Sequence, residues 1–252
     1  MRRLDNKVIL LAGGAGGIGT ATAERLASEG AAVVIGDINA DEARGVARKI
    51  SEGGGRAVAV ELDIGDIDSV NAFVETGVRT FGGIDGLHAN AALLAIQHLD
   101  LDAVEIDLDI WDKLLQVDLT GYFYCTRAVV PHMLERGGGS IVYMSSGAAF
   151  IGEGTRVAYA VSKAGINAIM RHVVTRWGQQ GIRANSIAPG LVLTPTTEKL
   201  SSDFLDLQRQ LTPSPRLGRV EDIASMVALL MSEEGSWVLG QVIGVNGGVL
   251  FQ

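Results

Sequence analysis

The sequence of 252 residues has little of several features that mark specialised classes of protein. A single cysteine excludes an internal disulfide and is typical of a chain that folds in a reducing compartment. Only 5 prolines accompany 33 glycines that follow no fixed period, which excludes collagen-like and proline-rich disordered chains. No run approaches the ~20 apolar residues of a membrane span, and Val8–Ala12 is too short for the core of a signal peptide. We therefore expect a cytoplasmic globular protein without a membrane partner.

Positive charge is also scarce, with 21 Lys and Arg against 29 Asp and Glu and a net charge of −8. Because nucleic acids are polyanions, we expect no nucleic-acid partner.

The neighbours of Cys125 offer no activating base, which favours a buried structural thiol. His88, His98, His132 and His172 lack metal-binding spacing, so no metal site is expected.

Short apolar runs alternate with longer amphipathic stretches along the whole chain. The runs carry β-branched residues and almost no charge, as strands covered on both faces do. They are residues 8–12, 31–36, 57–62, 84–89, 140–145, 183–188 and 241–245. The stretches with helical spacing are residues 17–29, 41–51, 66–81, 110–136, 157–180 and 221–231. This alternation predicts one α/β domain over residues 1–252, with a doubly wound, parallel, seven-stranded sheet and helices on both faces.

A glycine-rich turn follows the first predicted strand and opens the first predicted helix. Its sequence is Gly13-Gly14-Ala15-Gly16-Gly17-Ile18-Gly19. Glycine lets the backbone turn tightly and approach phosphates, and a helix N-terminus offers free N–H groups and a positive dipole end. The turn fits two patterns, with the key glycines at 14, 16 and 19 or at 13, 17 and 19. A merely permissive turn is the alternative, but the position favours a dinucleotide pyrophosphate site.

Asp37 ends the second predicted strand, 18 residues after Gly19. A carboxylate at this place accepts hydrogen bonds from the adenosine ribose hydroxyls and repels a 2′-phosphate. Neither Ala15 nor Ile38 supplies a cation to neutralise such a phosphate. The sequence therefore favours NAD over NADP, with a simple strand-end turn residue as the alternative for Asp37.

Tyr159 is the one tyrosine with a lysine four residues on, Lys163. On a helix these positions share a face, and an ammonium near a phenol favours the phenolate that acid–base chemistry needs. Ser146 follows the fifth predicted strand, and the carboxyl ends of parallel strands are where ligands bind. The three residues predict proton transfer at a substrate oxygen, whereas the alternative is a chance pairing on a helix surface.

Together these motifs resemble the short-chain dehydrogenase/reductase family. The matching segments run in order over essentially the whole chain and favour the glycine register 13, 17 and 19. They are Gly13-x-x-x-Gly17-x-Gly19, Asp63, Ala89-Asn90-Ala91-Ala92, Ser146, Tyr159-x-x-x-Lys163, Pro189-Gly190, 240–243 and 245–248. The resemblance implies that Tyr159 is the general acid or base. It also implies that Lys163 assists Tyr159 and holds the nicotinamide ribose, and that Ser146 hydrogen-bonds the substrate oxygen.

The resemblance implies further cofactor contacts. Asp63 and the backbone of Ile64 would meet the adenine, and Asn90 the ribose region. Contacts at the nicotinamide and phosphates are implied for Pro189, Gly190, Val192 and Thr194. It also implies the strand order 3-2-1-4-5-6-7, a homotetramer, and a mobile substrate loop over residues 194–218.

The chain departs from the family pattern at Asp118, where the family's catalytic tetrad has an asparagine. That asparagine holds a water of a proton relay. Aspartate accepts the same hydrogen bonds but does not donate as an amide does, and its charge repels a phenolate. We expect the relay to tolerate the carboxylate, with reduced activity as the alternative.

The sequence thus predicts an NAD-dependent oxidoreductase that interconverts a secondary alcohol and a ketone by hydride transfer. The expected pocket positions lean apolar and favour a hydrophobic or cyclic alcohol over an open polyol: Leu93, Ala148, Phe150, Gly190, Leu191 and parts of 200–211. Two alternatives stay open: an NADP-linked reductase of carrier-bound 3-oxoacyl groups, and a dinucleotide-binding protein without redox turnover. The acidic stretch within 93–109 is expected to be a solvated surface, with a binding loop as the alternative.

Overall fold

The central strands of this chain, such as Val8–Ala12 and Ala32–Asp37, are mostly apolar because both faces of their sheet are covered. The structure, a computed structural model, describes residues 2–251. Its main sheet is parallel throughout, in the order β3-β2-β1-β4-β5-β6-β9. The strands are β1 (Val8–Ala12), β2 (Ala32–Asp37), β3 (Arg56–Glu61), β4 (Gly86–Ala89), β5 (Gly139–Met144), β6 (Ile182–Pro189) and β9 (Val242–Val245). The order 3-2-1-4-5-6-7 is the one that the resemblance implied.

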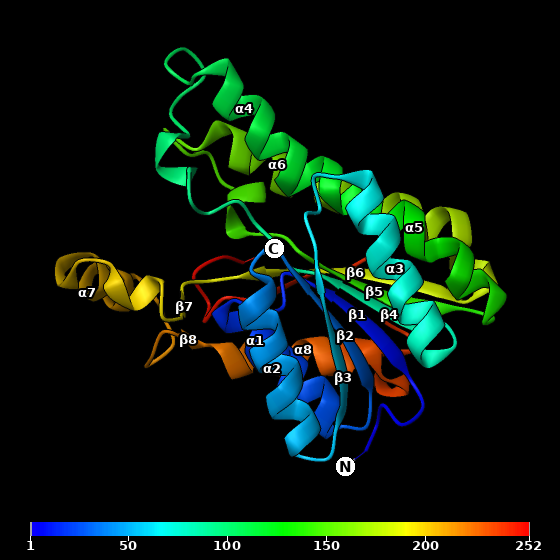
Figure 1. Ribbon diagram of the computed structural model, residues 1–252. Helices are drawn as coiled ribbons and strands as arrows, with labels where there is room; N and C mark the ends of the chain where they lie inside the picture. Colours follow the sequence, from blue (N-terminus) through cyan, green and yellow to red (C-terminus); the bar gives the residue numbers. More distant parts are fainter. Residues whose placement is uncertain (1, 252) are drawn as a thin grey trace.

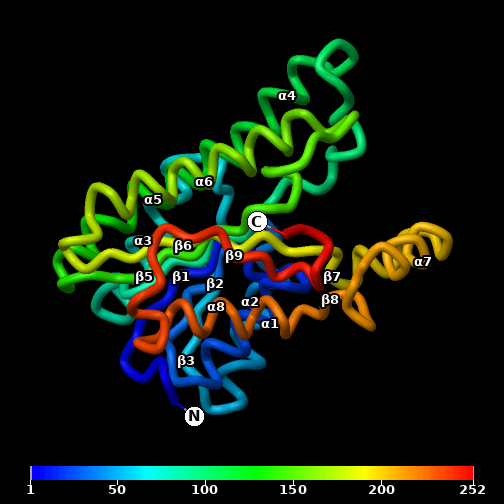
Figure 2. The backbone as a smooth tube through the Cα atoms, turned by 180° about the vertical axis from the view of Figure 1, so that it is seen from behind, coloured from blue at the N-terminus to red at the C-terminus, as the bar shows by residue number. Residues whose placement is uncertain are grey.

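Helices form a layer on each face of the sheet (Figure 1). One layer consists of α3 (Ile67–Phe81), α5 (Gly121–Glu135) and α6 (Val157–Trp177). The other consists of α1 (Gly17–Ser28), α2 (Ala40–Glu52) and α8 (Val220–Met231). Figure 2 shows the same two layers from behind. Each layer has its own buried apolar cluster, the first around Phe73 and Tyr143 and the second around Leu26 and Ile35.

The predicted long helix over 110–136 is divided in the structure. α4 (Leu108–Leu115) passes into a π-helical turn, Gln116–Thr120, before α5 begins. A π turn widens the backbone locally and is common at functional sites. Here it surrounds Asp118, so the irregularity falls on the residue that departs from the family pattern.

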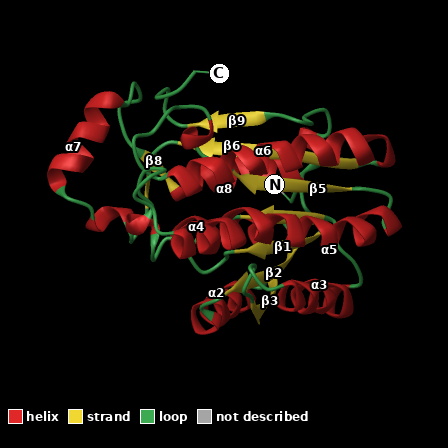
Figure 3. Cartoon of the chain, turned by 90° about the horizontal axis from the view of Figure 1, so that it is seen from above, coloured by secondary structure: helices red, strands yellow, loops and turns green. Residues whose placement is uncertain are grey.

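Two segments extend beyond the carboxyl ends of the strands. α7 (Ser202–Leu211) lies well clear of the sheet, on the side to which the strand arrows point (Figure 3). The short parallel pair β7 (Val192–Leu193) and β8 (Gly218–Arg219) joins the two ends of the segment that carries α7. Residues 194–218 are therefore a long excursion with fixed ends. None of the helices within residues 2–251 has both the length and the apolarity to cross a bilayer.

Candidate active site

The glycine turn bends at the carboxyl end of β1 under close steric limits. Gly13 has φ +83°, a conformation that side-chain-bearing residues rarely adopt. A Cβ on Gly13 would lie 2.5 Å from the backbone nitrogen of Ala91, and a Cβ on Gly19 would overlap the Gly13 carbonyl oxygen. The chain therefore needs glycine at both positions.

The same test separates the two possible glycine registers. A Cβ on Gly17 would lie 2.9 Å from Cβ of Thr194, whereas a Cβ on Gly16 would meet nothing within 4 Å. A Cβ on Gly14 would also be crowded, at 2.5 Å from Cγ2 of Ile35, so it is the contrast between Gly16 and Gly17 that supports the register 13, 17 and 19.

The first turn of α1 faces this bend with its N–H groups free of local side-chain partners. The N-cap is Gly16, which offers no capping side chain, and no acidic residue stands in the first helical turn. Free N–H groups and a positive dipole end at a glycine-lined bend fit the pyrophosphate of a dinucleotide.

A cleft at the carboxyl ends of the strands, called here the carboxyl-end cleft, has a volume of about 520 Å³. This volume falls in the ~300–1,000 Å³ range of small-molecule sites. It brings together fifteen of the predicted site residues: Gly13, Ala15, Gly17, Ile18, Asp37, Ile38, Asp63, Ile64, Asn90, Tyr159, Lys163, Pro189, Gly190, Val192 and Thr194. Gly19 lies behind this lining, against Gly13. Asp118 and Ser146 directly follow the lining residues Val117 and Ser145.

Asp37 is fixed at the edge of the cleft. Its Oδ2 accepts the backbone N–H of Ala15 at 2.9 Å, and its Oδ1 accepts that of Asn39 at 3.0 Å. Among the described residues that line the cleft, Asp37, Glu42 and Asp63 are acidic, and Lys163 is the one lysine or arginine. A ligand that carried an extra phosphate near Asp37 would meet negative charge.

Lys163 places a buried cation beside two aromatic hydroxyls. Its side chain is 2% exposed, and Nζ donates to the carbonyl oxygen of Met144 at 3.1 Å. Nζ lies 5.4 Å from the ring centroid of Tyr159 and 5.0 Å from that of Tyr122. Burial by itself lowers the pKa of an ammonium, but Tyr122, Tyr159 and Asp118 outweigh it and raise the pKa of Lys163. The lysine therefore remains cationic beside the Tyr159 phenol.

Asp118 is 1% exposed within the π-helical turn, and its Oδ1 accepts the backbone N–H of Leu93 at 2.8 Å. Burial raises the pKa of Asp118, and Asp100 adds to this effect, although the Lys163 ammonium and the Leu93 N–H oppose it. A raised pKa favours the neutral carboxyl. A neutral carboxyl has one O–H donor and one carbonyl acceptor, which makes it the closest chemical substitute for an amide.

Ser146 begins a short 3₁₀ turn, Gly147–Ala149, directly after β5. Its Oγ accepts the N–H of Ala148 at 3.2 Å, so its own hydrogen is free for another acceptor. The preceding Ser145 donates from Oγ to the carbonyl oxygen of Lys163 at 3.3 Å. The end of β5 is thus joined to the helix that carries Tyr159 and Lys163.

Asn90 braces the glycine turn from the neighbouring strand. Its Nδ2 donates to the Gly13 carbonyl oxygen at 2.7 Å. The Tyr122 hydroxyl, which no sequence motif singles out, donates to the carbonyl oxygen of Ala91 at 2.9 Å. These bonds hold the segment after β4 against the turn.

Thr197 is another residue that sequence reasoning missed. Its Oγ1 accepts the N–H of Thr194 at 2.7 Å and donates to the carbonyl oxygen of Val192 at 2.8 Å. The Thr-x-x-Thr spacing is a signal for such a local turn. Thr197 thereby fixes the start of the excursion over 194–218 where it borders the cleft.

Among the described residues, side chains outside the cleft that could act as a nucleophile or a metal ligand are not placed for chemistry. Burial raises the pKa of the Cys125 thiol to about 12, which makes it unreactive. Burial lowers the pKa of His88 to about 4, although a hydrogen bond with the Val142 carbonyl opposes the shift. Within residues 2–251 no group of three or more His, Cys, Asp or Glu is arranged to hold a metal ion.

Comparison with known proteins agrees with this geometry. The sequence profile described as "Enoyl-(Acyl carrier protein) reductase" matches residues 13–250. The chain belongs to the short-chain dehydrogenase/reductase family. This membership, with the parallel sheet, confirms the predicted Rossmann-type fold and oxidoreductase class.

Members of the short-chain dehydrogenase/reductase family match over nearly the whole chain. An oxidoreductase of Mycobacterium tuberculosis is 41% identical over 249 residues, 98% of this chain and 99% of that protein. Cis-4-hydroxycyclohexanecarboxylate dehydrogenase of Sinomonas cyclohexanicum is 37% identical over 242 residues, 96% of each. A solved 7α-hydroxysteroid dehydrogenase, in complex with NADH and 7-oxoglycochenodeoxycholic acid, has a TM-score of 0.92 and 32% identity. That match covers 98% of this chain and 95% of the solved chain.

Proposed function

We propose that this short-chain dehydrogenase/reductase uses NAD and interconverts a secondary alcohol and a ketone. The observation that carries the proposal is the buried Lys163 ammonium, 5.4 Å from the Tyr159 ring in a cleft that opens on the glycine turn. The nicotinamide supplies the hydride chemistry when the cofactor is bound. The protein then has to orient the substrate and move one proton.

Tyr159 exchanges that proton with the substrate oxygen. The Lys163 charge stabilises the phenolate, and Ser146 donates its free hydroxyl hydrogen to the same oxygen. Burial raises the pKa of Asp118, which makes its neutral form easier to reach, and in that form the carboxyl would be both donor and acceptor in the proton relay. We propose this as the physical reason why the relay tolerates aspartate in place of asparagine.

The cofactor is held along the carboxyl-end cleft. We propose that the turn with Gly13, Gly17 and Gly19 and the N–H group of Ile18 hold the pyrophosphate. Ala15, whose own N–H donates to Asp37, lines the site beside it. The other predicted contacts would keep their roles, with Asp63 and Ile64 at the adenine, Asn90 at a ribose and Pro189, Gly190, Val192 and Thr194 at the nicotinamide end. Asp37 would bind the adenosine ribose beside Ile38.

The charge at the edge of the cleft favours NAD over NADP. Asp37, Glu42 and Asp63 contribute three carboxylates, and Lys163 is the one lysine or arginine among the described lining residues. A 2′-phosphate at the Asp37 end would be repelled, because like charges close together in a partly buried site are costly.

The substrate is proposed to be a hydrophobic or cyclic secondary alcohol or its ketone. Exposed apolar side chains stand on α7, at Phe204 and Leu207, and on the segment after β5, at Phe150 and Ile151. Both segments follow strands at their carboxyl ends, and residues 194–218 would be the loop that closes on the substrate. A bulky apolar ligand would cover this surface.

We also propose that the protein is a homotetramer and that it resides in the cytoplasm. A homotetramer would bury exposed side chains such as Trp237, at 94% exposure, and Phe251, at 85%. A reducing cytoplasmic location fits the single buried thiol at Cys125.

A panel of secondary alcohols with NAD, and of ketones with NADH, tests the proposed reaction through the absorbance of the reduced nicotinamide. We expect turnover with at least one cyclic or bulky apolar substrate and little with open polyols. A parallel titration with NADH and NADPH tests the cofactor choice, and tighter binding of NADPH would reverse it. That result would favour the NADP-linked reductase of carrier-bound 3-oxoacyl groups, since a 3-oxoacyl-[acyl-carrier-protein] reductase of Thermotoga maritima is 36% identical over 248 residues.

The Asp118→Asn variant separates the enzyme from a dinucleotide-binding protein without redox turnover. If Asp118 blocks the relay, the wild type is inactive and the variant gains activity. If the relay tolerates a neutral carboxyl, both proteins turn over the same substrate at comparable rates.

A further inference from the structure

The helix that carries Tyr159 and Lys163 begins without a cap of its own. Its N-cap, Arg156, has φ +63° and contributes no side-chain hydrogen bond to the first turn. By contrast, α3 and α7 are capped by the local side chains of Asp66 and Ser201. The N–H groups at the start of α6 must therefore find partners elsewhere in the chain.

Those partners come from Asp100, 58 and 59 residues earlier in the chain. Asp100 Oδ1 accepts the N–H of Ala158 at 3.0 Å, and Oδ2 accepts the N–H of Tyr159 at 2.8 Å. The backbone adds two bonds, from Arg156 N–H to the Asp100 carbonyl oxygen at 2.9 Å and from Val157 N–H to the Leu101 carbonyl oxygen at 3.4 Å. Four consecutive N–H groups thus donate to residues 100 and 101.

Asp100 is 2% exposed, although it lies in the stretch that the sequence assigned to a solvated surface. For this residue that expectation was wrong. A buried carboxylate is costly unless its charge is compensated, and here two N–H donors and the positive end of the α6 dipole compensate it.

The segment over residues 93–100, which ends at Asp100, also contacts Asp118, the aspartate that stands in place of the family's asparagine. It begins at Leu93, whose N–H donates to Asp118 at 2.8 Å, and Leu93 and Leu94 line the carboxyl-end cleft. One stretch of chain therefore bonds to Asp118 at its start and to the backbone of Tyr159 at its end. The relay residue and the proton-transfer residue share a support.

We propose that Asp100 is a positioning residue, whose carboxylate holds the first turn of α6 and thereby fixes the Tyr159 hydroxyl for proton transfer. The inference rests on the proposed function for its effect on turnover. Misplacement of a reacting group by about 1 Å can cost about 100-fold in rate.

The test compares Asp100→Ala and Asp100→Asn with Asp66→Ala, which removes a local cap from a helix that carries no proposed catalytic residue. We expect Asp100→Ala to lower kcat by about 10- to 100-fold while the Kd for NADH stays within about twofold. Asp100→Asn keeps one acceptor oxygen and should fall between Asp100→Ala and wild type. Asp66→Ala should leave kcat unchanged at the same temperature, well below unfolding.

Amide hydrogen exchange gives a readout that needs no substrate. Loss of the Asp100 carboxylate should speed exchange at residues 157–160, whereas Asp66→Ala should speed it only at the start of α3. An Asp100→Ala protein with wild-type kcat, or with unchanged exchange at 157–160, overturns the proposal. If Asp100→Ala does not fold, Asp100→Asn decides by the same two measurements.

The experiment also separates this inference from the proposed function. A wild-type protein that turns over no alcohol or ketone contradicts the proposed function and the effect on kcat that rests on it. The exchange rates at residues 157–160 then decide whether Asp100 fixes the backbone of Tyr159.

Discussion

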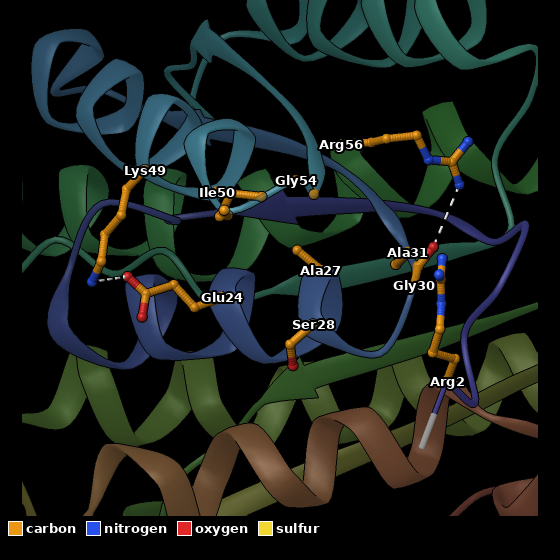
Figure 4. A pocket seen from close by; sticks show the side chains of 12 residues that line it. Arg2, Glu24, Ala27, Ser28, Gly30, Ala31, Lys49, Ile50, Gly54 and Arg56 are labelled. Atoms are coloured by element: carbon orange, nitrogen blue, oxygen red, sulfur yellow. Dashed lines mark hydrogen bonds and ion pairs between the residues drawn. The ribbon is translucent and has the colours of Figure 1, made fainter.

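The carboxyl-end cleft has a counterpart at the opposite end of the same two helices. Between α1 and α2, near the start of β2 and β3, lies a second cavity of about 390 Å³, called here the amino-end cavity (Figure 4). Its charged side chains already have partners, since Lys49 pairs with Glu24 at 2.6 Å and Arg56 donates to the Gly30 carbonyl oxygen at 3.4 Å. In the carboxyl-end cleft, the buried Lys163 has no direct carboxylate partner within residues 2–251.

Helix direction explains much of the difference. α1 presents its N-terminal residue Gly17 to the carboxyl-end cleft and its C-terminal residue Ser28 to the amino-end cavity. α2 does the same with Glu42 and Lys49. The positive dipole ends of both helices therefore point toward the cleft, and their negative ends toward the cavity. Cavity volume alone therefore does not mark a ligand site, whereas free N–H donors and a buried charge do.

The largest expected effect comes from Tyr159→Phe. The substitution keeps the ring that Lys163 faces and removes the one hydroxyl proposed to move a proton. We expect kcat to fall by about 10³-fold, within the ~10²–10⁴-fold range for loss of an acid–base group, with the Kd for NADH within about twofold of wild type. Steady-state kinetics and NADH fluorescence measure the two quantities. Retained turnover would show that Tyr159 is not the proton-transfer residue. The carboxyl-end cleft would then no longer differ from the amino-end cavity by a catalytic side chain.

Asp37→Ala should have the next largest effect, on binding rather than turnover. Hydrogen bonds to a charged group contribute ~1.5–3 kcal/mol, so we expect NADH to bind about 10- to 100-fold more weakly. The preference over NADPH should shrink as well, because one negative charge is removed. Titration of both cofactors measures this, with Asp41→Ala as an exposed acidic control. An unchanged ratio would show that Asp37 does not select the cofactor.

Asp118→Asn should change how stability depends on pH. Because burial raises the pKa of Asp118 in the folded state, the folded protein binds that proton more tightly than the unfolded chain. The free energy of unfolding of the wild type therefore falls as pH rises from the unfolded pKa through the folded pKa. Asparagine does not titrate, so this fall in the free energy of unfolding is absent from the variant. The variant should therefore become more stable relative to the wild type as pH rises toward neutral.

Thermal unfolding from pH 4 to pH 8 measures the Asp118 effect. For a chain of this size 1 kcal/mol corresponds to a shift of ~2–4 °C in Tm. The difference in Tm between Asp118→Asn and wild type should grow with pH, and the same scan on Asp203→Asn, a substitution at an exposed side chain, is the control. A flat difference for Asp118→Asn would contradict the neutral carboxyl in the proposed relay.

Glu24→Gln should have the smallest effect. It removes the ion pair with Lys49 in the amino-end cavity, where the side chains are 35% and 71% exposed. Exposed pairs of this kind contribute ~0–1 kcal/mol, so Tm should move by a few degrees at most and kcat and NADH binding should not change. A clear loss of activity would show that this cavity also has a functional role.

Much of the fold could be predicted because local pattern and global packing agree. Uncharged runs with β-branched residues, at 8–12 and 31–36, are stable only inside a covered sheet, and the amphipathic stretches between the strands supply the cover. The i, i+4 spacing of Tyr159 and Lys163 survives in the structure because both lie on one regular helix, α6. The π-helical break at Gln116–Thr120 was not predicted, because the helical periodicity of the sequence runs through it. The position of the Asp118 side chain depends on its contact with Leu93, which is distant in the chain.

The alternation of strands and helices, the glycine turn with its following Asp37, and the Tyr159–Lys163 pair could all be predicted from local sequence, since each depends on residues close together in the chain. The family resemblance already favours the glycine register, but its steric reason, crowding of Gly13 by Ala91 and of Gly17 by Thr194, is visible only in the folded chain. Only the tertiary structure decided that Asp100 lies buried on the first turn of α6. Both depend on atoms that are far apart in sequence and meet only after the strands have aligned their carboxyl ends. The excess of glycine was visible from the start, but its reason at these positions is contact with distant backbone and side-chain atoms.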